Sequence, residues 1–159
     1  IIATRYSDYD LIILQELISI LKKDNKEIII FDNALEITQK SSFLLNRLDN
    51  FVYKEKRFPN IQELERIEHE MFMDLDNKIY VNLKIEEIAK KNKVYLIQRK
   101  KIFCNLDNKT CPALTDDGYK IYYDYGHITT EGAKFFSRKI QNDSLFLKYL
   151  YSTFNLSFN

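Results

Sequence analysis

The feature that most constrains the fold is an alternation of short apolar runs with longer segments of helical periodicity. The apolar runs at residues 1–6, 27–31 and 94–97 have the length of single strands. In the segments between and after them, apolar side chains return every three or four residues, as on one face of a helix. Parallel strands need crossover connections, and helices supply them in βαβ units. The alternation therefore predicts an α/β fold built on a parallel sheet.

Polar and turn-forming residues predict where the early elements begin and end. Asp8 is expected to be the N-cap of the first helix, and Asp24-Asn25 to end it. Phe43 to Leu48 predicts a short helix, and Arg57-Phe58-Pro59-Asn60 interrupts helical structure. The other helices before the third strand are expected over residues 61–73 and 81–91.

The last third of the chain begins with a turn and ends in helices. Asp116-Asp117-Gly118, flanked by short extended runs, predicts a hairpin. Thr129 or Thr130 is expected to cap a helix, and residues 145–154 are expected to form another. The core-facing side of the helix after the threonines is expected to hold Ala133, Phe136 and Ile140.

Length and composition bound the class of the protein. A chain of 159 residues suits one domain, and 45% apolar residues with 11 Phe and 11 Tyr exclude a disordered chain. The 24 basic and 23 acidic side chains give a net charge of +1, which shows no bias toward nucleic acid. No apolar run has the length of a membrane span. Because the chain starts in an apolar run without methionine, we expect it to be the C-terminal portion of a longer protein.

Two cysteines, Cys104 and Cys111, leave two redox interpretations open. Their spacing provides no second pair of ligands, so a structural zinc site is not expected. The pair is either two unrelated thiols in a reducing cytosol or a local disulfide in an exported protein.

The segment around His127 carries the pattern with the clearest chemical meaning. Asp124 stands three residues before His127, just ahead of a predicted helix. In a tight turn, the Asp124 carboxylate would accept a hydrogen bond from His127 Nδ1 and leave Nε2 available as a general base. Gly126 is expected to provide an unusual backbone angle, and Gly132 to let the helix lie close to a neighbour. The alternative is a helix N-terminus with a solvated histidine.

Binding sites in parallel sheets gather at the carboxyl ends of the strands. This rule points to Asp32-Asn33, to the loop after Ile97 and to the stretch around Asp124. We therefore expect Asp124 and His127 to lie at the carboxyl edge of the sheet.

The block that contains Asp124 and His127 resembles a known family. These residues, followed by an apolar residue, a threonine and Gly132-Ala133, resemble the C-terminal block of SGNH hydrolases, the GDSL esterase and acyltransferase superfamily. Together with the cysteine pair and Tyr122-Tyr123, the block is similar to the SGNH domain appended to bacterial membrane O-acyltransferases, which acetylate O-antigen or other surface glycans.

The opening residues fit the same resemblance. Ile1-Ile2-Ala3-Thr4-Arg5-Tyr6 resembles the strand and Ala-x-Arg-Trp segment of those domains, with Tyr6 at the tryptophan position. The resemblance implies a three-layer α/β/α fold of flavodoxin-like SGNH type. It also implies a serine in a Gly-Asp-Ser motif, which occurs nowhere in this sequence. We therefore expect residues 1–159 to be the C-terminal portion of one SGNH-like domain, with the first strand and the nucleophile upstream.

The resemblance implies an activity and a set of site residues. The activity is acyl transfer, of acetyl above all, or ester hydrolysis on a bacterial cell-surface glycan such as lipopolysaccharide. His127 would be the base, Asp124 would orient it, and residues 1–159 alone would be inactive without the serine. The resemblance also implies a Cys104–Cys111 disulfide. The candidate substrate contacts are Arg5, Tyr6 and Tyr125.

The resemblance further implies a cellular setting. The domain would lie on the extracytoplasmic side, tethered to the membrane through an upstream membrane acyltransferase domain that delivers the acyl group. Its partner would be a surface carbohydrate acceptor, and no nucleic acid, metal or cofactor is expected. Two alternatives remain, a non-catalytic carbohydrate-binding or interaction domain on the same scaffold and a free-standing cytoplasmic esterase with reduced cysteines.

Three other groups of side chains have two interpretations each. Glu65 and His69 have the spacing of metal ligands on a helix, but one histidine among carboxylates is more typical of a solvated helix face. A tyrosine cluster next to His127 suits either sugar stacking or hairpin packing, and it comprises Tyr119, Tyr122, Tyr123 and Tyr125. Basic residues around the third strand are either solvent-exposed or close to an anionic surface, and they comprise Lys90, Lys91, Lys93, Arg99, Lys100 and Lys101.

Overall fold

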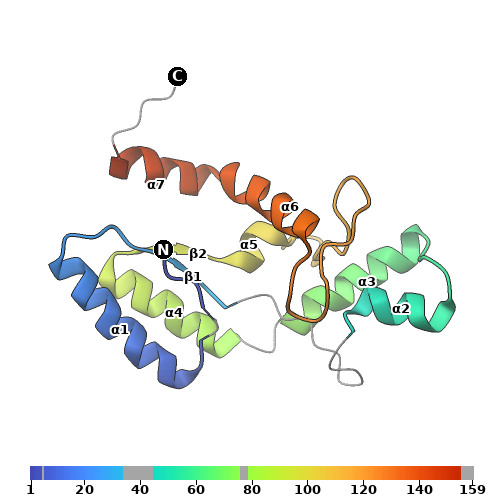
Figure 1. Cartoon of the computed structure of the whole chain (residues 1–159), viewed down its shortest axis with the longest axis horizontal. Helices are drawn as coiled ribbons and strands as arrows, with labels where there is room; N and C mark the ends of the chain where they lie inside the picture. Colours follow the sequence, from blue (N-terminus) through green and yellow to red (C-terminus); the bar gives the residue numbers. More distant parts are fainter. Residues whose placement is uncertain (5, 34–44, 76–78, 155–159) are drawn as a thin grey trace. The chain divides into compact units, whose positions relative to one another are not determined.

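The computed structural model describes residues 1–159 except residues 5, 34–44, 76–78 and 155–159 (Figure 1). The chain forms two compact units, each with its own hydrophobic core. The first unit comprises Ile1–Ala34 and Lys78–Arg99, and the second comprises Leu35–Asn77 and Lys100–Asn159. The second unit therefore includes a segment inserted between the two halves of the first.

The first unit is built on a small parallel sheet. Strand β1 (Ile29–Phe31) pairs in parallel with β2 (Tyr95–Ile97). Ile30 pairs with Leu96 on β2 and also forms a parallel bridge with Ile2, so β1 lies in the middle. The three predicted segments are thus parallel neighbours, and the α/β fold class is confirmed.

Two helices pack with this sheet. Helices α1 (Asp8–Lys23) and α4 (Ile79–Asn92) lie side by side in the first unit (Figure 1). Their periodic apolar residues meet β1 in one core, which explains the helical periodicity seen in the sequence. The buried residues of this core are Tyr6, Leu11, Leu14, Ile18, Ile28, Ile30, Ile85 and Ile88.

The start of α1 differs from the prediction. The N-cap is Ser7, and Asp8 is the first helical residue. The Asp10 carboxylate accepts hydrogen bonds from the Ser7 hydroxyl at 2.6 Å and from the Ser7 backbone N–H at 2.7 Å. These bonds fix the helix entry one residue earlier, and they lower the pKa of the Asp10 carboxyl.

The second unit is mainly helical. The helix predicted over residues 43–48 is wrong in extent, because α2 begins at Arg47 behind the N-cap Asn46, and residues 43–44 lie outside the described residues. Helix α5 begins at the last residue of the first unit and was not predicted. None of the helices in the described ranges is long and apolar enough to cross a membrane. The helices are α2 (Arg47–Glu55), α3 (Ile61–Asp74), α5 (Arg99–Phe103), α6 (Thr130–Gln141) and α7 (Ser144–Phe154).

Two short hairpins precede α6. In the first, Leu114 and Lys120 form an antiparallel bridge, and Gly118 has a φ of 79°. This hairpin confirms the prediction made from Asp116-Asp117-Gly118, since glycine adopts such a φ at little cost. In the second, Tyr122 and Ile128 form an antiparallel bridge. The second hairpin carries Asp124 and His127 at its tip.

Helix α6 lies against the second hairpin through Gly132. A Cβ atom at this position would stand 2.3 Å from the Ile121 carbonyl oxygen, so only glycine fits there without a shift. The predicted close approach is confirmed. The predicted helix face is partly wrong, because Ala133 is exposed, whereas Gly132, Phe135 and Phe136 are buried.

Candidate active site

Asp124 and His127 form the pair that their spacing predicts. His127 Nδ1 lies 2.8 Å from Asp124 Oδ2 and 3.0 Å from Oδ1. The His127 side chain is 75% exposed, whereas that of Asp124 is 23% exposed. Because Nδ1 faces the carboxylate, Nε2 lies on the opposite side of the ring, where it can take a proton from a hydroxyl group.

The Asp124 carboxylate is also held by the backbone of its own turn. Oδ1 accepts hydrogen bonds from the backbone N–H groups of Gly126 and His127, both at 2.8 Å. Desolvation raises the pKa of Asp124, but these bonds and the His127 ring outweigh it, so the pKa is below its ordinary value. The carboxylate therefore stays ionised to a lower pH than an ordinary aspartate. Gly126 does not have the predicted unusual backbone angle, because Gly118 is the one glycine in the described ranges with positive φ.

The turn is fixed to the start of α6. The N-cap is Thr129, whose hydroxyl oxygen accepts a bond from the Gly132 backbone N–H at 3.0 Å. The same hydroxyl donates to the Lys120 carbonyl at 2.6 Å. The Tyr123 backbone N–H donates to the His127 carbonyl at 2.7 Å, which closes the hairpin around the pair.

Residues at the start of helix α2 also bind the segment that forms the second hairpin. Asn46 is buried, and its amide donates to the Tyr122 carbonyl at 3.1 Å while its side-chain oxygen caps α2 at the Asp49 N–H. The ammonium group of Lys120 lies 2.9 Å from both carboxylate oxygens of Asp49. These contacts could not be predicted from the sequence, because the partners are 76 and 71 residues apart and no sequence pattern pairs polar residues at such separations.

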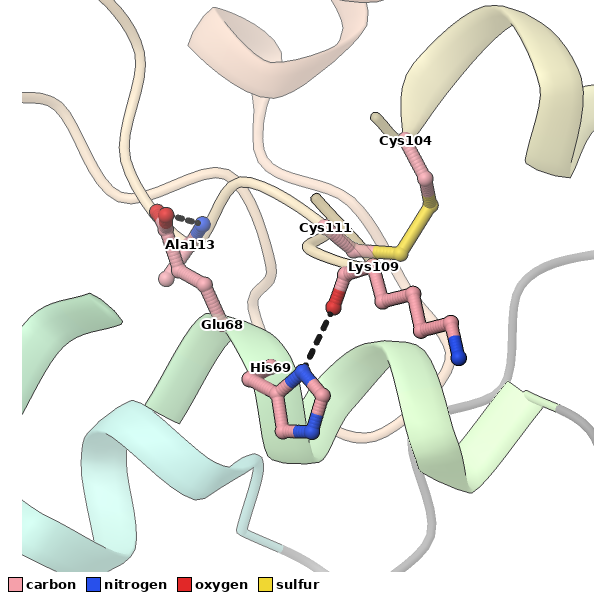
Figure 2. The surroundings of a disulfide bond; sticks show 6 residues. All are labelled: Glu68, His69, Cys104, Lys109, Cys111 and Ala113. Atoms are coloured by element: carbon pink, nitrogen blue, oxygen red, sulfur yellow. Dashed lines mark hydrogen bonds between the residues drawn. A yellow bond between two sulfur atoms is a disulfide. The ribbon is translucent and has the colours of Figure 1, made fainter. Parts of the chain in front are cut away.

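The Cys104–Cys111 disulfide is present, as the family resemblance implied (Figure 2). The Cα atoms of the two cysteines lie 4.3 Å apart, and both side chains are buried. An antiparallel bridge between Asn105 and Thr110 closes the loop between them. The disulfide therefore belongs to the core of the second unit.

The end of the disulfide loop runs along α3, where two adjacent residues hold it (Figure 2). His69 Nδ1 lies 2.9 Å from the Lys109 carbonyl oxygen, and a Glu68 carboxylate oxygen accepts the Ala113 N–H at 2.9 Å. The Glu68 carbonyl accepts the Cys111 N–H at 3.1 Å. His69 is exposed, as expected for a helix face, but its ring also binds the loop. No group of three or more metal-binding side chains occurs among the described residues.

Glu68 provides a pH-dependent test of this contact. Burial raises the pKa of its carboxyl, although the Ala113 N–H lowers it. A folded-state pKa above the unfolded value means that ionisation of Glu68 costs stability as the pH rises through the folded-state pKa.

Glu68→Gln keeps the acceptor oxygen without the charge. We therefore expect it to raise the melting temperature at about pH 8, and the gain to vanish at about pH 4. Thermal unfolding of the complete protein at several pH values measures this, with Glu16→Gln, an exposed residue of α1, as control. A gain of equal size at both pH values would contradict the assignment.

The other predicted site residues lie in the first unit or at the hairpin tip. Arg5 lies outside the described residues. Tyr6 is buried, its hydroxyl has no hydrogen-bond partner in the described structure, and desolvation raises its pKa to about 12. Tyr125 is partly exposed in the turn between Asp124 and His127. Roles for these three residues in substrate binding stay predictions.

Asp32 and Asn33 follow β1 and are buried at the carboxyl edge of its sheet. Asp32 accepts a hydrogen bond from the Arg99 backbone N–H at 2.9 Å, and Asn33 accepts one from the Tyr6 N–H at 2.6 Å. These side chains tie together the three segments that end at this edge. The prediction that Asp124 and His127 lie at the same edge stays a prediction.

Comparison with known proteins gives the family. The family described as the SGNH domain (fused to AT3 domains) matches residues 2–142. The chain is also similar to the periplasmic domain of a lipopolysaccharide acetyltransferase from Salmonella ser. Paratyphi A, with a TM-score of 0.52 and 20% sequence identity. That similarity covers 87% of this chain and 51% of the Salmonella domain, so the chain spans about half of that domain's length. No curated protein matches. With the family match over most of its length, the chain belongs to the SGNH domains of the type fused to AT3 domains.

Proposed function

We propose that the protein containing this chain transfers an acetyl group to, or removes it from, a hydroxyl group of a bacterial cell-surface glycan. The observation that carries this proposal is the hydrogen bond between His127 Nδ1 and the Asp124 carboxylate, at 2.8 Å. The His127 ring is largely exposed, so a substrate can reach it. Membership of the SGNH domains fused to AT3 domains supports acyl chemistry. The similarity to a lipopolysaccharide acetyltransferase domain supports a glycan as the acceptor.

The proposed chemistry uses His127 as the base for a serine upstream of residue 1. The serine oxygen attacks the acyl carbonyl carbon while its proton passes to His127 Nε2, and the leaving alcohol takes that proton as an acyl-serine forms. A glycan hydroxyl or water then attacks the carbonyl carbon of the acyl-serine and gives its proton to Nε2. The bond between the acyl group and the serine oxygen breaks, and the serine oxygen takes the proton from Nε2. Asp124 keeps Nδ1 protonated and stabilises the imidazolium that forms in each step.

The proposed setting is extracytoplasmic, with the domain tethered to the membrane through an upstream acyltransferase domain. The buried Cys104–Cys111 disulfide supports this setting, because disulfides persist in oxidising compartments and not in a reducing cytosol. The membrane domain would deliver the acyl group, and no cofactor is needed for the transfer to the glycan.

The proposal is tested by deleting the gene and restoring it. We expect the complete protein to restore O-acetyl groups on the surface polysaccharide, and the purified protein to hydrolyse p-nitrophenyl acetate. The 159-residue chain alone should give only background hydrolysis, since it holds the base but no Gly-Asp-Ser serine. An unchanged O-acetyl content after deletion would favour the non-catalytic carbohydrate-binding alternative. Strong hydrolysis by the chain alone would show that the chemistry uses other residues.

A further inference from the structure

An exposed tyrosine lies across the second hairpin from His127. In the second hairpin, Tyr122 bridges Ile128, and the Tyr123 N–H donates to the His127 carbonyl at 2.7 Å. Opposite residues in an antiparallel pair project from the same face, so the side chains of Tyr123 and His127 share one face of the hairpin. Tyr122, on the other face, is fully buried, whereas Tyr123 is 70% exposed. Hairpin packing therefore accounts for Tyr122 but leaves the Tyr123 ring in solvent next to the base.

Charged side chains continue from Tyr123 onto helix α2. The ammonium group of Lys120 lies 5.9 Å from the centroid of the Tyr123 ring and 3.4 Å from the Tyr123 carbonyl oxygen. The same group is 2.9 Å from both carboxylate oxygens of Asp49, in the first turn of α2. This ion pair links the hairpin to the surface of α2 and keeps the ammonium group over the exposed ring.

A second exposed tyrosine follows one turn along α2. Tyr53 is four residues after Asp49, so the two side chains are neighbours on one helix face. The Tyr53 ring is 66% exposed, and the ammonium group of Lys56 lies 4.2 Å from its centroid. Aromatic and charged groups thus alternate from the hairpin to the end of α2. We call this set the aromatic row, and it comprises Tyr123, Lys120, Asp49, Tyr53 and Lys56.

We infer that the aromatic row binds the acceptor glycan as an extended chain of sugars and leads one of its hydroxyl groups to His127; this inference rests on the proposed function. A sugar ring has an apolar C–H face that suits a tyrosine ring, and a rim of hydroxyl groups that suits ammonium and carboxylate groups. Two exposed tyrosines separated by an ion pair offer both kinds of contact in alternation.

The composition of the row argues against two other occupants. A protein-binding surface has a contiguous apolar centre from which Lys and Asp are depleted, whereas an ion pair lies between these two rings. A nucleic acid needs uncompensated positive charge, whereas Asp49 pairs with Lys120, and the chain has a net charge of only +1.

Binding of polysaccharide to the complete protein tests the inference. The probe is the surface polysaccharide of the producing bacterium, released from its lipid and de-O-acetylated with mild base. Titration calorimetry uses protein that carries His127→Ala, so that no turnover occurs. We expect Tyr123→Ala to raise the dissociation constant by roughly tenfold and Tyr53→Ala by roughly threefold, because each removes one stacking ring. Tyr123→Phe keeps the ring and should stay within about twofold of the parent.

The matched control is Tyr80→Ala. Tyr80 is 63% exposed with Lys84 at 5.8 Å from its ring, but it lies on α4 in the first unit, outside the aromatic row. It should bind the probe like the parent. Absence of saturable binding by the parent, or parent-like binding by both Tyr123→Ala and Tyr53→Ala in folded protein, would overturn the inference. Failure of the proposed function gives a different result, namely tyrosine-dependent binding by a protein that never changes the O-acetyl content of the polysaccharide.

Discussion

Replacing His127 with alanine in the complete protein should lower turnover by about a thousandfold or more, because the proposed serine nucleophile would lose its base. Asp124→Asn should cost less than His127→Ala. The asparagine side chain can still accept backbone N–H bonds in the turn, so the imidazole stays in place. It has no charge, however, to fix the Nδ1–H tautomer or to stabilise the imidazolium. Turnover is measured as hydrolysis of p-nitrophenyl acetate and as acetyl transfer to polysaccharide.

The control for this experiment is the chain's other histidine. His69→Ala should leave turnover unchanged, because its ring binds the disulfide loop through the Lys109 carbonyl and not the second hairpin. Circular dichroism confirms that each variant is folded. If His127→Ala retains more than about a tenth of the parent turnover, the base is another group and the proposed mechanism is wrong.

Gly132→Ala should give the largest loss of stability among single methyl additions to α6. Alanine is normally the better helix former by about 1 kcal/mol, so propensity alone predicts stabilisation. Here the added Cβ would stand 2.3 Å from the Ile121 carbonyl oxygen, which is a backbone atom and cannot rotate away. The helix and the hairpin must separate, at a net cost of roughly 3 kcal/mol, which corresponds to a fall of about 10 °C in melting temperature.

The matched control for Gly132→Ala is Ser137→Ala on the same helix. Ser137 is exposed, so its replacement should change the free energy of unfolding by less than about 0.5 kcal/mol. Thermal unfolding of the complete protein, followed by circular dichroism, measures both variants. A melting temperature for Gly132→Ala within about 2 °C of the parent would show that α6 does not lie this close to Ile121.

The sequence predicts local features of this protein well. The apolar runs that become strands, the hairpin at Gly118, the cap of α6 and the Asp124–His127 pair all depend on residues close together in the chain. The parallel pairing of the strands joins distant residues and followed from the general rule for βαβ units. The errors are also local, since Ser7 rather than Asp8 caps α1, and Ala133 is exposed although it follows a buried glycine. Each error is one residue wide: the cap of α1 lies one residue earlier than predicted, and the buried face of α6 includes Gly132 instead of Ala133.

Long-range polar contacts could not be predicted from one sequence. In the sequence, Asn46 is an ordinary polar residue ahead of a helix. In the structure it is buried, and its side-chain amide donates a hydrogen bond to the Tyr122 carbonyl. His69 reads as a surface histidine, yet it holds the Lys109 carbonyl beside the disulfide. Each contact depends on which segments the fold brings together, and hydrophobic periodicity carries no information about these partners.

All of the described hydrogen bonds that orient the Asp124 carboxylate come from its own turn. Every described bond that orients the carboxylate comes from residues 126 and 127, so the aspartate, the turn and the imidazole form one hydrogen-bonded unit of four residues. A displacement of the hairpin by α2 or α6 would therefore carry acid and base together and leave their mutual geometry intact. In the proposed mechanism, the serine would then have to be aligned with one preassembled unit, and not with the aspartate and the histidine separately.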